Sequence, residues 1–106
     1  MKFNTIKELK EYLKAGNNLY IKPTSSKENI EIQKFLLNNG FVWNGQEKWI
    51  DPKTIKYYRI FYSYDTDKYR IMFGSIDLHK NVTLSLCDMS NLLKNNFINT
   101  LFEDIL

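Results

Sequence analysis

The sequence predicts an α+β fold in one domain, residues 1–106. Apolar residues recur at helical spacing near the N-terminus and again from Asp88, and they alternate at period two in between. Helices placed before and after a run of strands are typical of the α+β class. We therefore expect an antiparallel β-meander of four to six strands, with two N-terminal helices and one or two C-terminal helices.

The first helix is expected to begin at Thr5. Thr5 and Glu8 have the spacing of a capping box, in which hydroxyl and carboxylate oxygens accept hydrogen bonds from free amides of the first turn. The apolar residues that follow share one helical face: Ile6, Leu9 and Leu13. Gly16 ends this helix. Residues 19–21 then form a short strand candidate.

A second helix is expected after Ser25, because Glu28 again follows a hydroxyl by three residues. Its apolar face contains Ile32, Phe35 and Leu36, with Ile30 and Leu37 at the sides. The Asn39-Gly40 pair ends it. The segment 41–50 is then predicted to form a tight hairpin about Asn44-Gly45, because these residues tolerate the positive φ angles of such turns. Of its two tryptophans, Trp43 and Trp49, we expect one to be buried and the other partly exposed.

The most informative stretch is residues 57–73, which predicts a long hairpin with its turn at Asp65 to Lys68 and with Tyr64 opposite Tyr69. One face is then apolar and aromatic and should pack on the core: Tyr58, Ile60, Tyr62, Tyr64, Tyr69, Ile71 and Phe73. The other face mixes guanidinium groups with apolar and aromatic side chains: Tyr57, Arg59, Phe61, Arg70 and Met72.

This second face has two interpretations. Guanidinium groups beside aromatic rings bind planar or anionic partners through stacking and cation–π contacts. The same face is also expected if a helix half covers it, with the arginine stems lying along apolar surface. On the first interpretation, Trp49, Lys53 and Lys56 lie at the rim of the contact surface.

The remaining segments complete the fold. Residues 76–78 and 82–86 alternate at period two and predict further strands. From Asp88 the apolar residues return to helical spacing and predict one or two helices, with a break near Asn95-Asn96. We expect no membrane span and no signal peptide, because no apolar run is long enough. A single cysteine gives no disulfide and favours reducing conditions, so a cytoplasmic location is expected.

Few residues are candidates for catalysis. His79 is the sole histidine, and Asp77 and Cys87 are its nearest catalytic neighbours in sequence, without any known signature around them. Asp65 and Asp67 flank Thr66 in the predicted turn, where aspartates bond to nearby amides more often than they hold Mg²⁺ or Ca²⁺. The four isolated glycines form no phosphate-binding loop. We expect no enzymatic activity, no cofactor and no metal.

The run from Ile32 to Gly45 combines an amphipathic helix, Gly40, an aromatic residue, Trp43 and a turn with glycine. It resembles small accessory proteins of bacteriophages and mobile elements, including anti-CRISPR proteins. The resemblance implies a non-catalytic inhibitor in the host cytoplasm that binds a host defence protein or ribonucleoprotein complex, such as a CRISPR effector. A net charge of +3 argues against an acidic mimic of nucleic acid.

Two other functions fit the same residues. A small binder of single-stranded RNA or DNA would stack bases on Tyr57 and Phe61 and hold phosphates with its cations, Arg59, Arg70, Lys53 and Lys56. An oligomeric sponge for a signalling nucleotide would place the aromatic residues in a pocket between subunits. The exposure of Arg59 and Arg70 distinguishes a binding face from a covered one.

Overall fold

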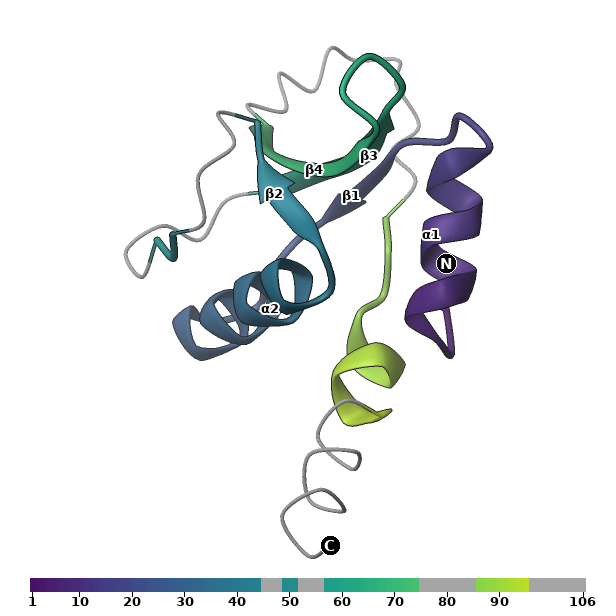
Figure 1. Cartoon of the computed structure of the whole chain (residues 1–106). Helices are drawn as coiled ribbons and strands as arrows, with labels where there is room; N and C mark the ends of the chain where they lie inside the picture. Colours follow the sequence, from purple (N-terminus) through teal and green to yellow (C-terminus); the bar gives the residue numbers. More distant parts are fainter. Residues whose placement is uncertain (45–48, 52–56, 75–85, 96–106) are drawn as a thin grey trace, which may run out of the picture.

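The computed structural model describes residues 1–44, 49–51, 57–74 and 86–95. Its elements, shown in Figure 1, are α1 (Ile6–Lys14), β1 (Leu19–Ile21), α2 (Ser26–Asn38), β2 (Phe41–Trp43), β3 (Tyr57–Ser63) and β4 (Lys68–Gly74). Residues 90–95 are also helical. The α+β class is confirmed.

Local signals begin and end both N-terminal helices as expected. The Thr5 hydroxyl accepts a hydrogen bond from the Glu8 amide at 3.2 Å, and the Ser25 hydroxyl accepts one from the Glu28 amide at 3.1 Å. The Glu8 carboxylate in turn accepts a hydrogen bond from the Asn4 amide. Gly16 and Gly40 follow the two helices with φ of 98° and 88°, a left-handed conformation that favours glycine.

The sheet is mixed, with strand order β1-β3-β4-β2. β3 pairs antiparallel with both β1 and β4, whereas β2 pairs parallel with β4. The predicted all-antiparallel meander is therefore wrong. The reason is that α2 connects β1 to β2, and a helical connection of this length brings two strands into parallel orientation. The β3–β4 hairpin lies between them, so β1, α2 and β2 form a split β-α-β unit.

The predicted tight hairpin over residues 41–50 is also wrong. Residues 49 and 50 are not in a strand, and β2 finds its partner in β4. The Trp43 indole N–H donates to the Trp49 carbonyl at 2.7 Å, so a side chain rather than a strand ladder holds the returning segment. The rest of the proposed turn, residues 45–48, lies outside the described residues.

The β3–β4 hairpin forms, but its register differs from the predicted one by two residues. Ser63 pairs with Lys68, and Tyr62 pairs with Tyr69, so the connection is 64–67. Asp67 adopts a φ of 53°, which closes this connection one residue earlier than expected. Because the displacement is even, the paired residues of β3 and β4 keep the faces that the sequence predicts. Tyr64 is the exception: it was expected to pack on the core, but it lies in the connection and is exposed.

The helices α1 and α2 lie on one side of the sheet (Figure 1), and the core residues pack between them and the sheet. Fully buried side chains come from α1, α2 and all four strands of the sheet: Leu9, Leu13, Ile32, Leu36, Leu19, Ile21, Phe41, Tyr58, Ile60 and Ile71. These apolar stripes are the ones that the helical and period-two spacing predicts.

A buried polar cluster ties α2 to residues 49–51. The Gln33 side chain accepts a hydrogen bond from the Asp51 amide at 2.7 Å and donates to the Asp51 carbonyl at 2.9 Å. Asn29 donates to the same carbonyl at 3.1 Å. Gln33 also lies 2.9 Å from the Tyr58 hydroxyl, and burial raises the pKa of Tyr58 to about 12. Asn29 and Gln33 are completely buried, and their hydrogen bonds to this segment compensate for the loss of water.

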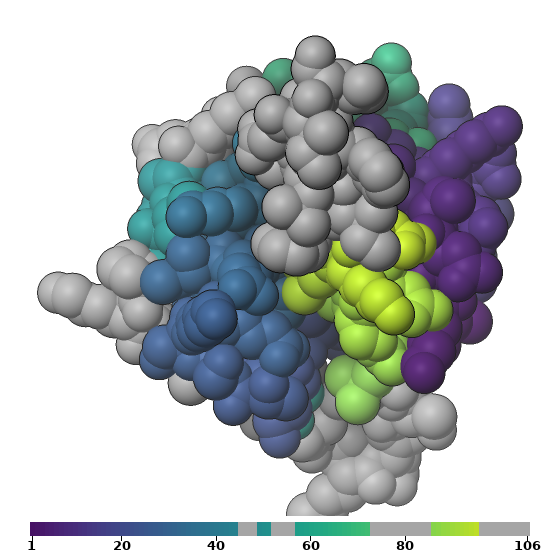
Figure 2. Space-filling model, turned by 90° about the horizontal axis from the view of Figure 1, so that it is seen from below, coloured from purple at the N-terminus to yellow at the C-terminus, as the bar shows by residue number. Residues whose placement is uncertain are grey.

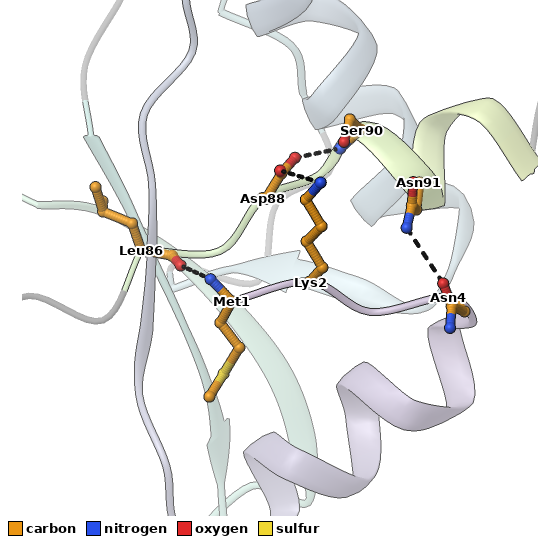
Figure 3. Close-up of polar contacts among 7 residues, drawn as sticks. All are labelled: Met1, Lys2, Asn4, Leu86, Asp88, Ser90 and Asn91. Carbon is orange, nitrogen blue, oxygen red and sulfur yellow. Dashed lines mark hydrogen bonds and ion pairs between the residues drawn. The ribbon is translucent and has the colours of Figure 1, made fainter.

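Residues 86–95 join the N-terminal segment at the edge beyond β1. The Met1 amino group donates to the Leu86 carbonyl at 3.0 Å, and Lys2 lies 3.7 Å from the Asp88 carboxylate (Figure 3). The Asp88 amide also donates to the Met1 carbonyl. Seen from below, this segment lies between α2 and α1 (Figure 2). The expected helix after Asp88 is confirmed over residues 90–95, whereas the expected strands at 76–78 and 82–85 lie outside the described residues.

Candidate binding face

One side of the sheet faces away from α1 and α2 and carries the residues of β3 and β4 that were predicted to bind a partner. Strand pairing places Tyr20, Arg59 and Met72 side by side across β1, β3 and β4. Tyr57 and Phe61 flank Arg59 on β3, and Lys22 lies beside Tyr57. We call these six residues the aromatic–basic face. Lys22 is exposed and the other five are half-buried.

Cations lie against rings on this face. The Arg59 guanidinium carbon is 4.7 Å from the centroid of the Phe61 ring, and the Lys22 ammonium is 5.3 Å from that of Tyr57. Each pair satisfies the distance for a cation–π interaction, worth about 0.5–1 kcal/mol at exposed sites. The rings thus hold two positive charges on the surface of a regular sheet.

The hydrogen bonds of Arg59 are incomplete. One terminal nitrogen donates to the Asn18 side chain at 3.3 Å, and the other lies 3.9 Å from the Met72 sulfur, a weak acceptor. Its Nε is buried and has no hydrogen-bond partner within the part of the chain that the structure describes. Guanidinium groups carry five N–H donors, so Arg59 has donors to spare for an acceptor from a partner.

Arg70 behaves differently, and the expectation that it is exposed is wrong. Only 4% of this residue is accessible, although it lies on the same side of the sheet, opposite Phe61. Its guanidinium donates to the carbonyls of Trp43 and Asn44 at 3.2 and 3.0 Å and to the Thr66 hydroxyl at 3.2 Å. Parallel pairing of β2 with β4 brings these carbonyls to Arg70, which therefore joins the end of β2 to the β3–β4 connection.

Trp49 does not belong to the aromatic–basic face. It stacks on Trp43 with ring centroids 5.1 Å apart, and Trp43 points to the core side of the sheet, 6.1 Å from Tyr58. Its predicted place at the rim is therefore wrong. The expected contrast between the tryptophans is confirmed, since Trp43 is 4% and Trp49 41% exposed. Lys53 and Lys56 lie outside the described residues.

Sequence reasoning overlooked three contributors from the β1 region, namely Asn18, Tyr20 and Lys22. The alternation of residues 19–21 indicated a strand. Tyr20 and Lys22 both lie on the side of this strand opposite the buried Leu19 and Ile21. The pairing of β1 with β3 depends on contacts between residues about forty positions apart, and no local signal encodes it.

The other candidate chemistry finds little support. Within the described ranges, no group of three or more histidine, cysteine, aspartate and glutamate side chains could hold a metal ion. Asp67 accepts a hydrogen bond from the Tyr62 hydroxyl. Cys87 is buried, and burial raises the pKa of its thiol to about 12. His79 and Asp77 lie outside the described residues.

Two further findings concern the chain as a whole. Over the described segments, no helix has both the length and the apolar character needed to cross a membrane. Comparison with protein-family models, with curated proteins and with solved structures found no match.

Proposed function

We propose that this chain is a non-catalytic binding protein that inhibits a host defence nuclease, such as a CRISPR effector, and that the aromatic–basic face holds the partner. The observation that carries the proposal is a sheet face on which two cations lie against two rings, partly open to solvent, with no carboxylate bonded to either cation in the described part of the chain. The resemblance of residues 32–45 to small phage accessory proteins supports the class of partner.

The composition of the face suits recognition. Tyrosine and arginine are enriched among the residues that dominate binding energy at protein interfaces. Their placement on strands limits the conformational entropy lost on binding, because the ring pairs already restrict Lys22 and Arg59. Positive charge favours an acidic or nucleoprotein partner and accelerates the encounter with it.

The state of Cys87 supports a non-catalytic role. A thiol with a pKa of about 12 is protonated at neutral pH, whereas thiolates are the nucleophilic form. Its neighbour Met89 lies 3.8 Å away, sulfur to sulfur, in an apolar setting. Cys87 thus has the properties of a core residue.

The proposal is tested by affinity capture from lysates of CRISPR-bearing bacteria, followed by a cleavage assay on any nuclease recovered. We expect the wild-type chain to capture a defence nuclease and to inhibit its DNA cleavage at near-stoichiometric amounts. Phe61→Ala should weaken inhibition by at least about tenfold, as expected for loss of an interface hot spot. Lys27→Gln, an exposed change on α2, is the matched control and should leave inhibition intact. Recovery of nucleic acid alone, with no nuclease inhibited, would contradict the proposal.

A further inference from the structure

We infer that the aromatic–basic face takes single-stranded nucleic acid, with phosphates at Lys22 and Arg59 and bases against the planar groups of β3. This inference rests on the proposed function and specifies which component of a defence nucleoprotein the face contacts. Two observations carry it: the cations have no carboxylate partner in the part of the chain that the structure describes, and planar groups follow one another along one strand.

The cations of this face are available to an anion. Within the described ranges only two ion pairs form, Lys2 with Asp88 and Lys7 with Glu11, and neither involves this face. Lys22 contacts a ring, and Arg59 contacts a ring, an amide oxygen and a thioether. Phosphate oxygens are strong acceptors for guanidinium N–H groups, and such charge-assisted bonds are about twice as strong as neutral ones.

The planar groups follow one another on a single strand. Tyr57, Arg59 and Phe61 occupy alternate positions of β3, so their side chains share one face at intervals of about 6.6–6.8 Å. Tyr20 lies opposite Arg59 on β1 and adds a ring beside this row. A nucleic-acid strand laid along β3 therefore meets ring, guanidinium and ring in sequence.

These features favour nucleic acid over an acidic peptide. Carboxylates of a peptide would pair with Lys22 and Arg59 but would leave the rings of Tyr57 and Phe61 without a planar partner. Unpaired bases stack on aromatic rings and on guanidinium planes, and each base–aromatic stack is worth about 1–3 kcal/mol. Double-stranded nucleic acid offers no free base faces for such stacking.

The test is fluorescence anisotropy with labelled 12-nucleotide oligo(dT) and oligo(U), using a 12-residue oligoglutamate as the competing probe. We expect both oligonucleotides to bind at 50 mM salt. The slope of log K against log salt should be about −1.4, the value for two phosphate contacts on a single strand. Arg59→Met should weaken binding by about tenfold and reduce the slope by about 0.7, whereas Lys27→Gln should change neither. Circular dichroism establishes that both variants are folded.

Failure takes forms that separate this inference from the proposed function. No oligonucleotide binding at 50 mM salt, or binding that Arg59→Met leaves unchanged, would overturn the inference. Tighter binding of oligoglutamate would assign the face to an acidic protein instead. Nuclease inhibition that persists without oligonucleotide binding would overturn the inference and leave the proposed function standing. Oligonucleotide binding without inhibition of any captured nuclease would overturn the proposed function and leave the inference standing.

Discussion

The two sides of the β3–β4 hairpin are built from alternate residues of the same two strands and have opposite environments. On the core side, Tyr58, Ile60 and Ile71 are completely buried beneath the helices. On the other side, Tyr57, Arg59 and Phe61 remain half-buried. Both sides carry aromatic residues, so aromatic content does not decide burial. The difference arises because the apolar stripes of α1 and α2 pack against the same side of the sheet and leave the other side without a covering helix.

Cation–π pairs occur on both sides and serve different purposes. On the core side, Lys10 and Lys14 of α1 lie 5.1 and 5.5 Å from the rings of Tyr69 and Tyr62. The hydroxyls of Tyr64 and Tyr69 also donate to carbonyls of α1, so these pairs attach a helix to the hairpin. On the aromatic–basic face, the cations come from the strands and their connections. Cation–π pairs therefore help to attach α1 to the sheet on the core side, whereas on the aromatic–basic face they leave positive charge at the surface.

The largest difference is expected from apolar truncations at adjacent positions of β3. Ile60→Ala should lower the free energy of unfolding by about 2–5 kcal/mol, because it leaves a cavity in a fully buried site. Phe61→Ala should cost about 1–2 kcal/mol despite removing more atoms, because its ring is half-buried. Urea denaturation measures both. Equal losses would mean that the two sides are packed alike.

The next contrast is between the two arginines that share one side of the sheet. Arg70→Met should destabilise the protein by about 1–3 kcal/mol, because the carbonyls of Trp43 and Asn44 lose a charged donor. Arg59→Met should change stability by less than about 1 kcal/mol, since its acceptors are an exposed amide and a thioether. Thermal and urea unfolding distinguish them. A larger loss of stability for Arg59→Met than for Arg70→Met would contradict the assignment of Arg70 as the structural arginine.

Substitution within the buried polar cluster of Asn29, Gln33 and Asp51 should lower stability, as expected for residues on the core side of the sheet. Gln33→Met should destabilise by about 1–3 kcal/mol, because the Asp51 backbone loses two hydrogen bonds to the Gln33 side chain. The change should also weaken the near-ultraviolet circular dichroism signal of the Trp43–Trp49 stack, which this segment holds in place. Lys34→Met, at an exposed neighbouring position, is the control. An unchanged tryptophan signal would show that Gln33 does not position residues 49–51.

The smallest effect is expected at the exposed edge, where Asp88 meets the N-terminal segment. Hydrogen bonds from Ser90, with Lys2 nearby, hold the pKa of Asp88 below its ordinary value. A carboxyl with a lowered pKa in the folded state contributes stability above its unfolded pKa of about 3.9, and that contribution is lost as the pH falls below it. Asp88→Asn should therefore lower the free energy of unfolding by less than about 1 kcal/mol at pH 7, and this cost should shrink as the pH falls through the lowered folded-state pKa.

The measurement is urea unfolding from pH 7 to pH 2, with Glu31→Gln, an exposed carboxylate of α2, as the control. If the loss of unfolding free energy caused by Asp88→Asn does not decrease as the pH falls, the charge of Asp88 does not stabilise this edge.

The helices and the long hairpin were predictable because their signals are local. Thr5 and Ser25 bond to amides three residues away, and the buried positions of α2 follow from the spacing within that helix. The two sides of the hairpin were also assigned correctly, because the period of two survives an even shift in register. The residues of the aromatic–basic face that lie on β3 were therefore found from sequence.

The sequence alone thus determined which segments are helical, which alternate, and which side chains share a face, since these depend on neighbours a few residues apart. Tertiary structure decided the strand order, the parallel pairing of β2, and the burial of Arg70 against carbonyls more than twenty positions away. It also took Trp49 to the core side and brought Lys22 and Tyr20 to Arg59 and its neighbours. The physical reason is that these contacts arise from packing the whole chain around one core, and no short segment carries enough free energy to specify them.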